Sequence, residues 1–457
     1  MTQEGSAVLS APSARPPGPR GLPLLGQAWH FGRDPLGFLA GIARRYGDIA
    51  YFTLGANRVF YVSRPEYIWE VLVAQRAKFE ISTMRLRLEP ALGTGLLTSR
   101  GELHARQRRL MLPVFRKSRI ESYAGVMFAY AARTRDRWRH GEVINVTDEM
   151  MRLAMGLAAK SLFDHDIEDD SDGVSRNLGI LLEFFARLMS PFLQLSLKLP
   201  LPSTLRLRRA MLELDEIIYR MIDVRRRNPL RGEDLLSLLV RARDDDTDEY
   251  MTEKQLRDEV FTLLMAGHET TANVLGWTAY LLSQHPEADG RAYDEVRSVL
   301  AGREQIQAAD LERLRFLRMV IMEGMRLYPP AWFVGRSALE DASIGGYTVP
   351  CGASVLMSQY LMHRDARYFE EPESFLPERW ADGLLERLPR GAFFPFSAGD
   401  RHCIGEGFAW QEALLVLATL IDRWRFELVP GQDIRPSPSI TLRPNAGIRM
   451  VTRLRKP

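Results

Sequence analysis

The chain has 457 residues, of which 46% are hydrophobic and 26% are charged, a composition typical of a globular protein with a large core. Its 61 Lys and Arg residues against 58 Asp and Glu give a formal net charge of +3, which argues against a nucleic-acid-binding protein. The two cysteines, Cys351 and Cys403, exclude a disulfide framework and favour a cytoplasmic location. No apolar run reaches the roughly 20 residues that cross a bilayer.

In chain order, residues 1–25 are rich in Pro, Gly, Ser and Ala, which predicts a flexible leader. Residues 26–457 show no linker and no repeat, which predicts a single two-lobed domain. The first elements expected are a helix near 35–46 and a hairpin with strands at 49–54 and 59–62. From there to about residue 335 the pattern is mostly helical.

The strongest helical signal begins at Thr252, which makes a capping-box pattern with Gln255. Apolar residues continue to about Ser283, so this helix is expected to cross the whole core. A final helix is expected from just after Cys403 to about Trp424. Short strands are expected at 344–349, 354–357, 426–429 and 448–453. The predicted fold class is mainly α with small β-sheets.

The segment from Phe396 to Gly405 has the features of a loop that holds a charged sulfur on a metal. A lone cysteine is more often a small buried hydrophobe. Here Gly399 permits a tight turn, and Gly405 lets a bulky group approach the backbone. The following helix N-terminus and the cation of Arg401 favour a thiolate. These neighbours point to Cys403 as a metal ligand.

This segment resembles the haem-binding signature of the cytochrome P450 family, Phe-x-x-Gly-x-Arg-x-Cys-x-Gly, at every fixed position. The resemblance implies the P450 fold, a helical bundle around haem b with a smaller β-rich lobe. It also implies that Cys403 is the axial thiolate ligand and metal ligand, and that Phe396, Arg401 and Gly405 contact the haem. The activity implied is a monooxygenase that inserts one atom of O2 into a lipophilic substrate such as a fatty acid, terpenoid, steroid or polyketide.

A second pattern concerns the support of that loop. Glu323 and Arg326 lie three residues apart on a predicted helix, and alone they indicate a surface ion pair worth at most about 1 kcal/mol. Their order and spacing relative to 377–380 resemble the family's Glu-x-x-Arg and Pro-Glu-Arg motifs. The resemblance implies a buried triad of Glu323, Arg326 and Arg379, in which loss of one member would cost several kcal/mol.

The centre of the long predicted helix breaks the rules for a helix interior. Gly costs about 1 kcal/mol there, and a Thr hydroxyl can bond the carbonyl four residues back and bend the helix. A tolerated kink with a polar patch is one explanation. The run Ala266-Gly267-x-Glu269-Thr270-Thr271 also resembles the family's oxygen-side signature. The resemblance implies that Thr270 and Glu269 deliver protons to dioxygen, and that Ala266 and Gly267 lie against the cofactor and leave room for O2.

The two carboxylates of haem need cations or hydrogen-bond donors. The resemblance implies that these groups come from Arg336, Arg401 and Arg108. It also implies a contribution from His104, since His104 and Arg108 match the form His-x-x-x-Arg that some family members have at this point. A further candidate metal ligand, His268, would point away from Thr270 by helical spacing. It is therefore expected to be structural or to face solvent.

Four cations near residue 110 define a possible partner surface; they are Arg106, Arg109, Arg116 and Lys117. They form either a solvated face or a patch that steers an acidic protein. Because no flavin domain follows the final helix, the resemblance implies a separate electron donor, a ferredoxin or flavodoxin with its reductase.

The resemblance also implies a lipophilic pocket lined from several segments. These are 84–97, Phe184, Phe185, Leu188 and 191–202, 263–266, 331–334 and 443–446. The apolar segment 191–202 could also touch a membrane surface. Two alternatives to a monooxygenase stay open: a haem-thiolate peroxygenase, isomerase or lyase without a reductase, and a non-catalytic haem sensor. The pair Glu269 and Thr270 disfavours both.

Overall fold

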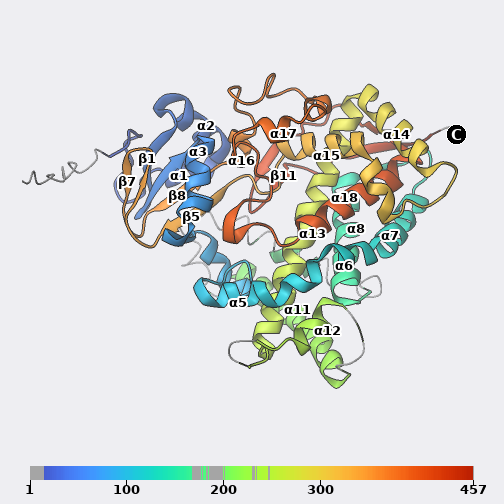
Figure 1. Cartoon of the computed structure of the whole chain (residues 1–457), viewed down its shortest axis with the longest axis horizontal. Helices are drawn as coiled ribbons and strands as arrows, with labels where there is room; N and C mark the ends of the chain where they lie inside the picture. Colours follow the sequence, from blue (N-terminus) through green and yellow to red (C-terminus); the bar gives the residue numbers. More distant parts are fainter. Residues whose placement is uncertain are drawn as a thin grey trace, which may run out of the picture.

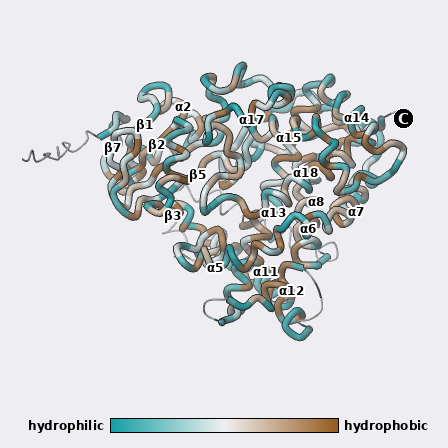
Figure 2. Tube along the Cα trace, in the orientation of Figure 1, coloured by the Kyte–Doolittle hydropathy of each residue, from teal (hydrophilic) through white to brown (hydrophobic). Residues whose placement is uncertain are grey.

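A computed structural model describes residues 15–166, 201–228, 234–244 and 248–455, together with 176, 177, 179–181, 184, 199 and 232. The chain forms a β-rich lobe and a larger helical lobe (Figure 1). Hydrophobic stretches follow the central helices, while the outer loops are mostly hydrophilic (Figure 2). The architecture is mainly α with small sheets, as predicted.

The β-rich lobe is built on a five-stranded sheet of order β1-β2-β8-β5-β3. Its strands are β1 (Ile49–Leu54), β2 (Asn57–Val62), β3 (Phe79–Ile81), β5 (Val334–Ala338) and β8 (Ser354–Met357). Side chains alternate between the two faces of a strand, and both faces are covered here. Along β2, Phe60 and Val62 pack into one apolar cluster, and Val59 and Tyr61 pack into the other.

Three smaller sheets complete the strands. They pair β6 (Ala342–Ile344) with β7 (Tyr347–Val349), β4 (Val143–Asn145) and β9 (Trp424–Leu428) with β12 (Arg449–Leu454), and β10 (Pro436–Pro438) with β11 (Leu442–Pro444). The prediction of one strand over 344–349 was wrong. Gly345 and Gly346 adopt positive φ values of 54° and 83°, so the chain reverses there and forms a hairpin.

The helices dominate the rest of the described chain. They are α1 (Ala28–Arg33), α2 (Pro35–Tyr46), α3 (Pro65–Trp69), α4 (Glu89–Leu92), α5 (Gly101–Met111), α6 (Lys117–Ser122), α7 (Ala124–Arg137), α8 (Val146–Phe163), α11 (Pro202–Arg227), α12 (Leu235–Arg241), α13 (Glu253–Gln284), α14 (Pro286–Leu300), α15 (Arg315–Leu327), α16 (Gln359–Met362), α17 (Leu384–Arg387) and α18 (Glu406–Ile421). The predicted helix at 35–46 is confirmed as α2. The final helix is shorter than predicted, because Trp424 already belongs to β9.

Helix α13 crosses the core, as its sequence predicted (Figure 1). It begins with the expected capping box, in which the Thr252 hydroxyl accepts from the Gln255 N–H at 3.2 Å and the Gln255 side chain accepts from the Thr252 N–H at 2.8 Å. Helices α8, α11, α15 and α18 pack around it. It ends at Gln284 because Pro286 starts the next helix and His285 is left outside helical geometry.

The predicted buried triad is confirmed. Glu323 and Arg326 are both fully buried, and two hydrogen bonds of 2.8 and 2.9 Å join them. Arg379 donates to the same carboxylate at 2.9 Å, and the Trp380 indole N–H donates to it at 2.9 Å. Because the charges are paired and their remaining hydrogen-bonding atoms are satisfied, this network avoids the penalty of an isolated buried charge.

The predicted leader is only partly within the described residues. From residue 15 onward it follows β1: the Tyr51 N–H donates to the Pro17 carbonyl at 2.9 Å, and Gln27 Nε2 donates to the Arg20 carbonyl at 2.7 Å. Residues 1–14 lie outside the described part of the chain. Within the described helices, none combines the length and the apolar character that a membrane crossing requires.

Candidate active site

The loop that carries Cys403 precedes α18 and closes on itself. The Cys403 N–H donates to the Phe396 carbonyl at 3.0 Å. Gly399 has a φ of 68°, and a Cβ there would lie 1.9 Å from the Leu72 carbonyl oxygen, so only glycine fits. At Gly405, by contrast, a Cβ would meet no protein atom closer than 3.9 Å. The protein alone therefore does not require glycine at 405.

The support for this loop reaches back to the buried triad through His363, which sequence analysis missed. Arg326 donates to the His363 carbonyl at 2.9 Å, and His363 Nε2 accepts from the Phe394 N–H at 3.0 Å. Burial holds the pKa of His363 well below its usual value, so the ring stays neutral and can accept that bond. The triad thus holds the cysteine loop through one imidazole ring.

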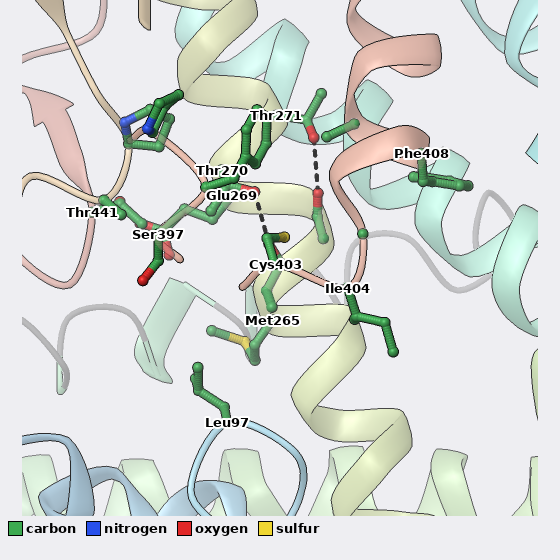
Figure 3. A pocket seen from close by; sticks show the side chains of 18 of the residues that line it. Leu97, Met265, Glu269, Thr270, Thr271, Ser397, Cys403, Ile404, Phe408 and Thr441 are labelled. Carbon is green, nitrogen blue, oxygen red and sulfur yellow. Dashed lines mark hydrogen bonds between the residues drawn. The ribbon is translucent and has the colours of Figure 1, made fainter. Parts of the chain in front are cut away.

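Cys403 faces a cavity of about 330 Å³ between that loop and α13 (Figure 3). The thiol has exposed surface, but this surface faces the cavity, and the surrounding protein raises the pKa of the thiol by burial. The Gly405 N–H and the Arg108 guanidinium act against that rise. We expected Arg401 to be the nearby cation. Instead Arg401 donates to the Ser99 carbonyl at 2.7 Å.

Of the predicted site residues, eight line this cavity: Cys403, Phe396, Arg401, Gly405, Ala266, Gly267, Glu269 and Thr270. The threonine hydroxyls make the predicted bonds along the helix, from Thr270 to the Ala266 carbonyl at 2.8 Å and from Thr271 to the Gly267 carbonyl at 3.2 Å. His268 is buried, and its Nδ1 lies 2.6 Å from the Leu264 carbonyl oxygen. It is structural and does not face solvent.

Glu269 has two partners that sequence analysis did not identify. Its Oε1 accepts from the Thr441 hydroxyl and from the Arg443 guanidinium at 2.5 Å. Both residues belong to the loop that joins β10 to β11 or to β11 itself, 172 and 174 residues away along the chain. Glu269 is 3% exposed and Arg443 is 27% exposed, so Arg443 links the buried acid to the surface.

Three further residues predicted to hold the haem carboxylates, His104, Arg108 and Arg336, are not part of the cavity lining. Burial and then the charges of Arg401, Arg108 and Arg336 lower the pKa of His104 to about 4. Burial and then the charge of Arg85 lower the pKa of Arg336 to about 9 and that of Arg401 to about 10. Arg85 was not predicted as a site residue. Within the described chain no carboxylate forms an ion pair with any of these arginines.

The chain resembles known proteins along most of its length. The family model of Cytochrome P450 matches residues 16–450. The chain belongs to the cytochrome P450 family. It is a haem-thiolate monooxygenase, like the relatives that it matches along almost its whole length.

Several relatives of this P450 come from Streptomyces. Cyclooctatin synthase of Streptomyces melanosporofaciens is 38% identical over 93% of this chain and 92% of that protein. Cyclooctat-9-en-7-ol 5-monooxygenase of the same organism is 36% identical over 94% of both chains, and pentalenene oxygenase of Streptomyces avermitilis is 33% identical over 92% of both. The solved cyanobacterial CYP120A1 with retinoic acid bound is 26% identical and superposes with a TM-score of 0.87, over 97% of this chain and 100% of that one.

The residues of this P450 fit its haem cofactor. Arg85, Arg336, Arg401 and Arg108 form a cluster of cations, none of which makes an ion pair with a carboxylate of the described residues. Such a cluster suits a group with two carboxylates. The space beside Gly405 that no protein atom fills suits a close approach by the macrocycle. The sulfur of Cys403 faces the same cavity, and a thiolate is a strong ligand for iron. When bound, haem supplies the activation of dioxygen.

The predicted substrate segments are placed only in part. Leu88, Leu92 and Leu97 from the first segment, Leu263, Met265 and Ala266 from α13, and Ala331 and Val334 after the proline pair line the cavity. The prediction for 443–446 was wrong, because Ile440 and Thr441 line the cavity instead. Phe184 is buried but is not part of the lining. Phe185, Leu188 and 191–198 lie outside the described residues.

A buried carboxyl on α18 is a further feature that the sequence did not reveal. Glu412 is 0% exposed, and neither of its oxygens has a hydrogen-bond partner in the described chain. The Thr271 side chain lies close enough to oppose the effect of burial on the pKa of this carboxyl as a hydrogen-bond donor, although its hydroxyl donates to the Gly267 carbonyl at 3.2 Å. Burial raises the pKa of Glu412 from 4.5 to about 8, so the carboxyl carries a proton at neutral pH.

This raised pKa predicts a pH-dependent stability. Below about pH 4.5 the carboxyl is protonated in both folded and unfolded chains, whereas between 4.5 and about 8 only the unfolded chain ionises. Stability is therefore lost as pH rises through this window. We expect Glu412→Gln to stabilise the protein relative to wild type, by an amount that grows between about pH 5 and pH 8. Urea unfolding at matched haem content measures this difference.

The exposed Glu386 on α17 provides the control. Glu386→Gln should change the free energy of unfolding equally at every pH. A Glu412→Gln variant whose stability follows that of wild type across the whole pH range would contradict a protonated, uncharged Glu412.

Proposed function

We propose that this cytochrome P450 hydroxylates a cyclic terpenoid, with Cys403 as the iron ligand and Glu269 and Thr270 as the groups that handle protons. The observation that carries the proposal is the cavity itself. It presents Cys403 on one side, Thr270 and Glu269 on another, and mostly aliphatic and aromatic side chains elsewhere (Figure 3). An apolar cavity with few polar groups suits a hydrocarbon-like substrate.

The polar lining argues against an acidic substrate. Arg85 and Arg401 are the cations of the lining, and both belong to the cluster proposed for the haem carboxylates. No other cation lines the cavity within the described residues, so none is left for a fatty acid. Two relatives are named for neutral compounds, the unsaturated alcohol cyclooctat-9-en-7-ol and the unsaturated hydrocarbon pentalenene, whereas the solved CYP120A1 has an acid, retinoic acid, bound.

For proton handling, the geometry favours an entry route by way of Arg443. Its guanidinium is partly exposed and contacts the buried Glu269, and Thr270 is the next residue on α13. The Thr270 hydroxyl donates to Ala266 and faces the cavity, so it can accept a further hydrogen bond there. We propose that Glu269 receives protons from the Arg443 side and that Thr270 presents them to the oxygen-binding space.

The electron donor stays a prediction. Of the four cations expected to steer a ferredoxin or flavodoxin, two are engaged within the protein: Arg106 and Arg109 bind the buried Asp244 at 3.0 and 3.1 Å. Lys117 lies 3.4 Å from Glu312 in an exposed pair. Arg116 is exposed. The steering surface is therefore smaller than the sequence suggested. A cytoplasmic location likewise stays a prediction.

Substrate class is tested by the change in haem absorption that follows when a substrate enters the cavity. We expect cyclic terpene hydrocarbons and their mono-alcohols to change the spectrum at concentrations at least about tenfold lower than a fatty acid of similar size, because the described part of the apolar lining offers no further cation for a carboxylate. Preference for the fatty acid would contradict the proposed class.

Iron ligation by Cys403 is tested with the reduced protein and CO. Wild type should show the strongly red-shifted Soret band of thiolate ligation, and Cys403→Ser should lose it while still binding haem. Cys351→Ser is the matched control, since this thiol is exposed, lies outside the cavity lining and donates to the Leu339 carbonyl at 3.1 Å. Loss of the band in the Cys351 variant, or its survival in the Cys403 variant, would refute the assignment.

The role of Thr270 is tested by the fate of electrons. With a surrogate reductase and ferredoxin, the Thr270→Ala variant should form on the order of tenfold less product per NADPH consumed than wild type. Hydrogen peroxide should form in place of product, because the proton donor is lost. Thr278→Ala is the control: its hydroxyl makes the same kind of bond on α13, to Val274 at 2.6 Å, but is fully buried outside the cavity. If both variants formed the same amount of product per NADPH consumed, Thr270 would not be the proton donor.

A further inference from the structure

A tight turn near the start of the described chain presents a leucine to solvent. Leu22 and Gly26 exchange two backbone hydrogen bonds, of 2.9 and 2.8 Å. The turn is fastened to the β1–β2 hairpin, since the Gln27 N–H donates to the Thr53 carbonyl at 2.7 Å and the Gly55 N–H donates to the Leu25 carbonyl at 2.9 Å. The turn therefore displays Leu24 from a fixed base beside the β1–β2 hairpin.

Leu24 is placed there at a cost. Its φ is 62°, a left-handed conformation that costs a non-glycine residue roughly 1 kcal/mol or more. Glycine or asparagine would remove most of this cost. Yet Leu24 is 95% exposed, so its side chain gains almost nothing from packing against the described chain. An unfavourable backbone that displays an apolar side chain indicates a function outside the folded core.

Leu24 is one of a group. Trp29 is 66% exposed, Leu22 is 49% exposed and Leu25 is 40% exposed. Single exposed apolar residues are normal, but contiguous apolar patches mark interaction sites. These four side chains lie within eight consecutive residues, on one turn and the short helix that follows it. Tryptophan with leucine is typical of side chains that enter the interface of a membrane.

The segment that carries this group has an excess of positive charge. Residues 15–48 contain five arginines and two aspartates, and the second aspartate, Asp48, pairs with Arg64 and Arg367. All five arginines are exposed: Arg15, Arg20, Arg33, Arg44 and Arg45. The first aspartate, Asp34, accepts from the Gly37 N–H at 2.9 Å. None of the five arginines forms an ion pair with a described carboxylate. Exposed arginines around apolar side chains complement an anionic lipid surface.

We propose that this N-terminal patch, formed by Leu22, Leu24, Leu25 and Trp29 with the five arginines, docks the enzyme on an anionic lipid surface. The apolar side chains enter the interface and the arginines contact lipid phosphates. A second copy of the chain is a poorer occupant, since it would bring two groups of five arginines together. The inference goes beyond the monooxygenase activity and does not depend on the substrate.

The experiment is flotation of the full-length holoenzyme with vesicles of phosphatidylcholine alone or mixed with phosphatidylglycerol, at low and high salt. We expect binding to the anionic vesicles, weakened by salt. The double variant Leu24→Gly with Trp29→Ser should lower the fraction bound on the order of tenfold. A matched double variant, Leu339→Ser with Leu385→Ser, removes two side chains of 52% and 45% exposure elsewhere on the surface and should bind as wild type does.

Thermal unfolding separates a lipid contact from an internal one. Because glycine adopts the left-handed conformation without strain, Leu24→Gly should keep or raise the unfolding temperature while it lowers vesicle binding. A lower unfolding temperature would show that Leu24 packs against the chain itself. That result would overturn the proposal. Failure of the holoenzyme to bind anionic vesicles, or equal binding of the two double variants, would also overturn it. So would a dimer, detected by light scattering, that the Leu24 and Trp29 changes abolish.

Discussion

The rest of the active site depends on one buried carboxylate, Glu323. It neutralises Arg326 and Arg379 away from solvent and accepts hydrogen bonds from Trp380 and from the backbone of Leu376. Arg326 in turn donates to three carbonyls of 363–374. The desolvation of these charges is large, so the network is stable only when every member is present. Its rigidity holds His363, and through it the loop that aims Cys403 at the cavity.

On the other side of the cysteine loop, Arg336 and Arg401 lie close to Arg85 without an ion pair to a described carboxylate. Burial, and then the positive charge of Arg85, lowers the pKa values of Arg336 and Arg401. Such a surplus of positive charge destabilises a folded chain on its own. The proposed binding of the two haem carboxylates by these arginines would remove the repulsion among their charges and would link haem binding to folding stability. The positive charge of this arginine cluster thus suits the protein with haem bound better than the protein alone.

The oxygen side shows how an irregular helix is used. Helix α13 tolerates Gly267 and two threonines in its centre because α8 and α18 pack around it. Its acid, Glu269, is fastened to the β10–β11 hairpin, whose Ile440 and Thr441 also line the cavity. Trp277 donates to the Leu442 carbonyl at 3.0 Å and anchors the same hairpin to α13. Part of the cavity lining and both partners of Glu269 therefore belong to one small structural unit.

Local sequence determined the features that depend on near neighbours: the capping box of α13, the i−4 bonds of Thr270 and Thr271, the glycine at 399 and the alternation along β2. Motif order also predicted the triad and the residues that face Cys403. The partners of Glu269 could not be predicted, because Thr441 and Arg443 are more than 170 residues away. The same holds for Arg85, for His363 and for the unpaired carboxyl of Glu412. Burial and charge at these positions are set by segments distant in the sequence, so only the tertiary structure decided them.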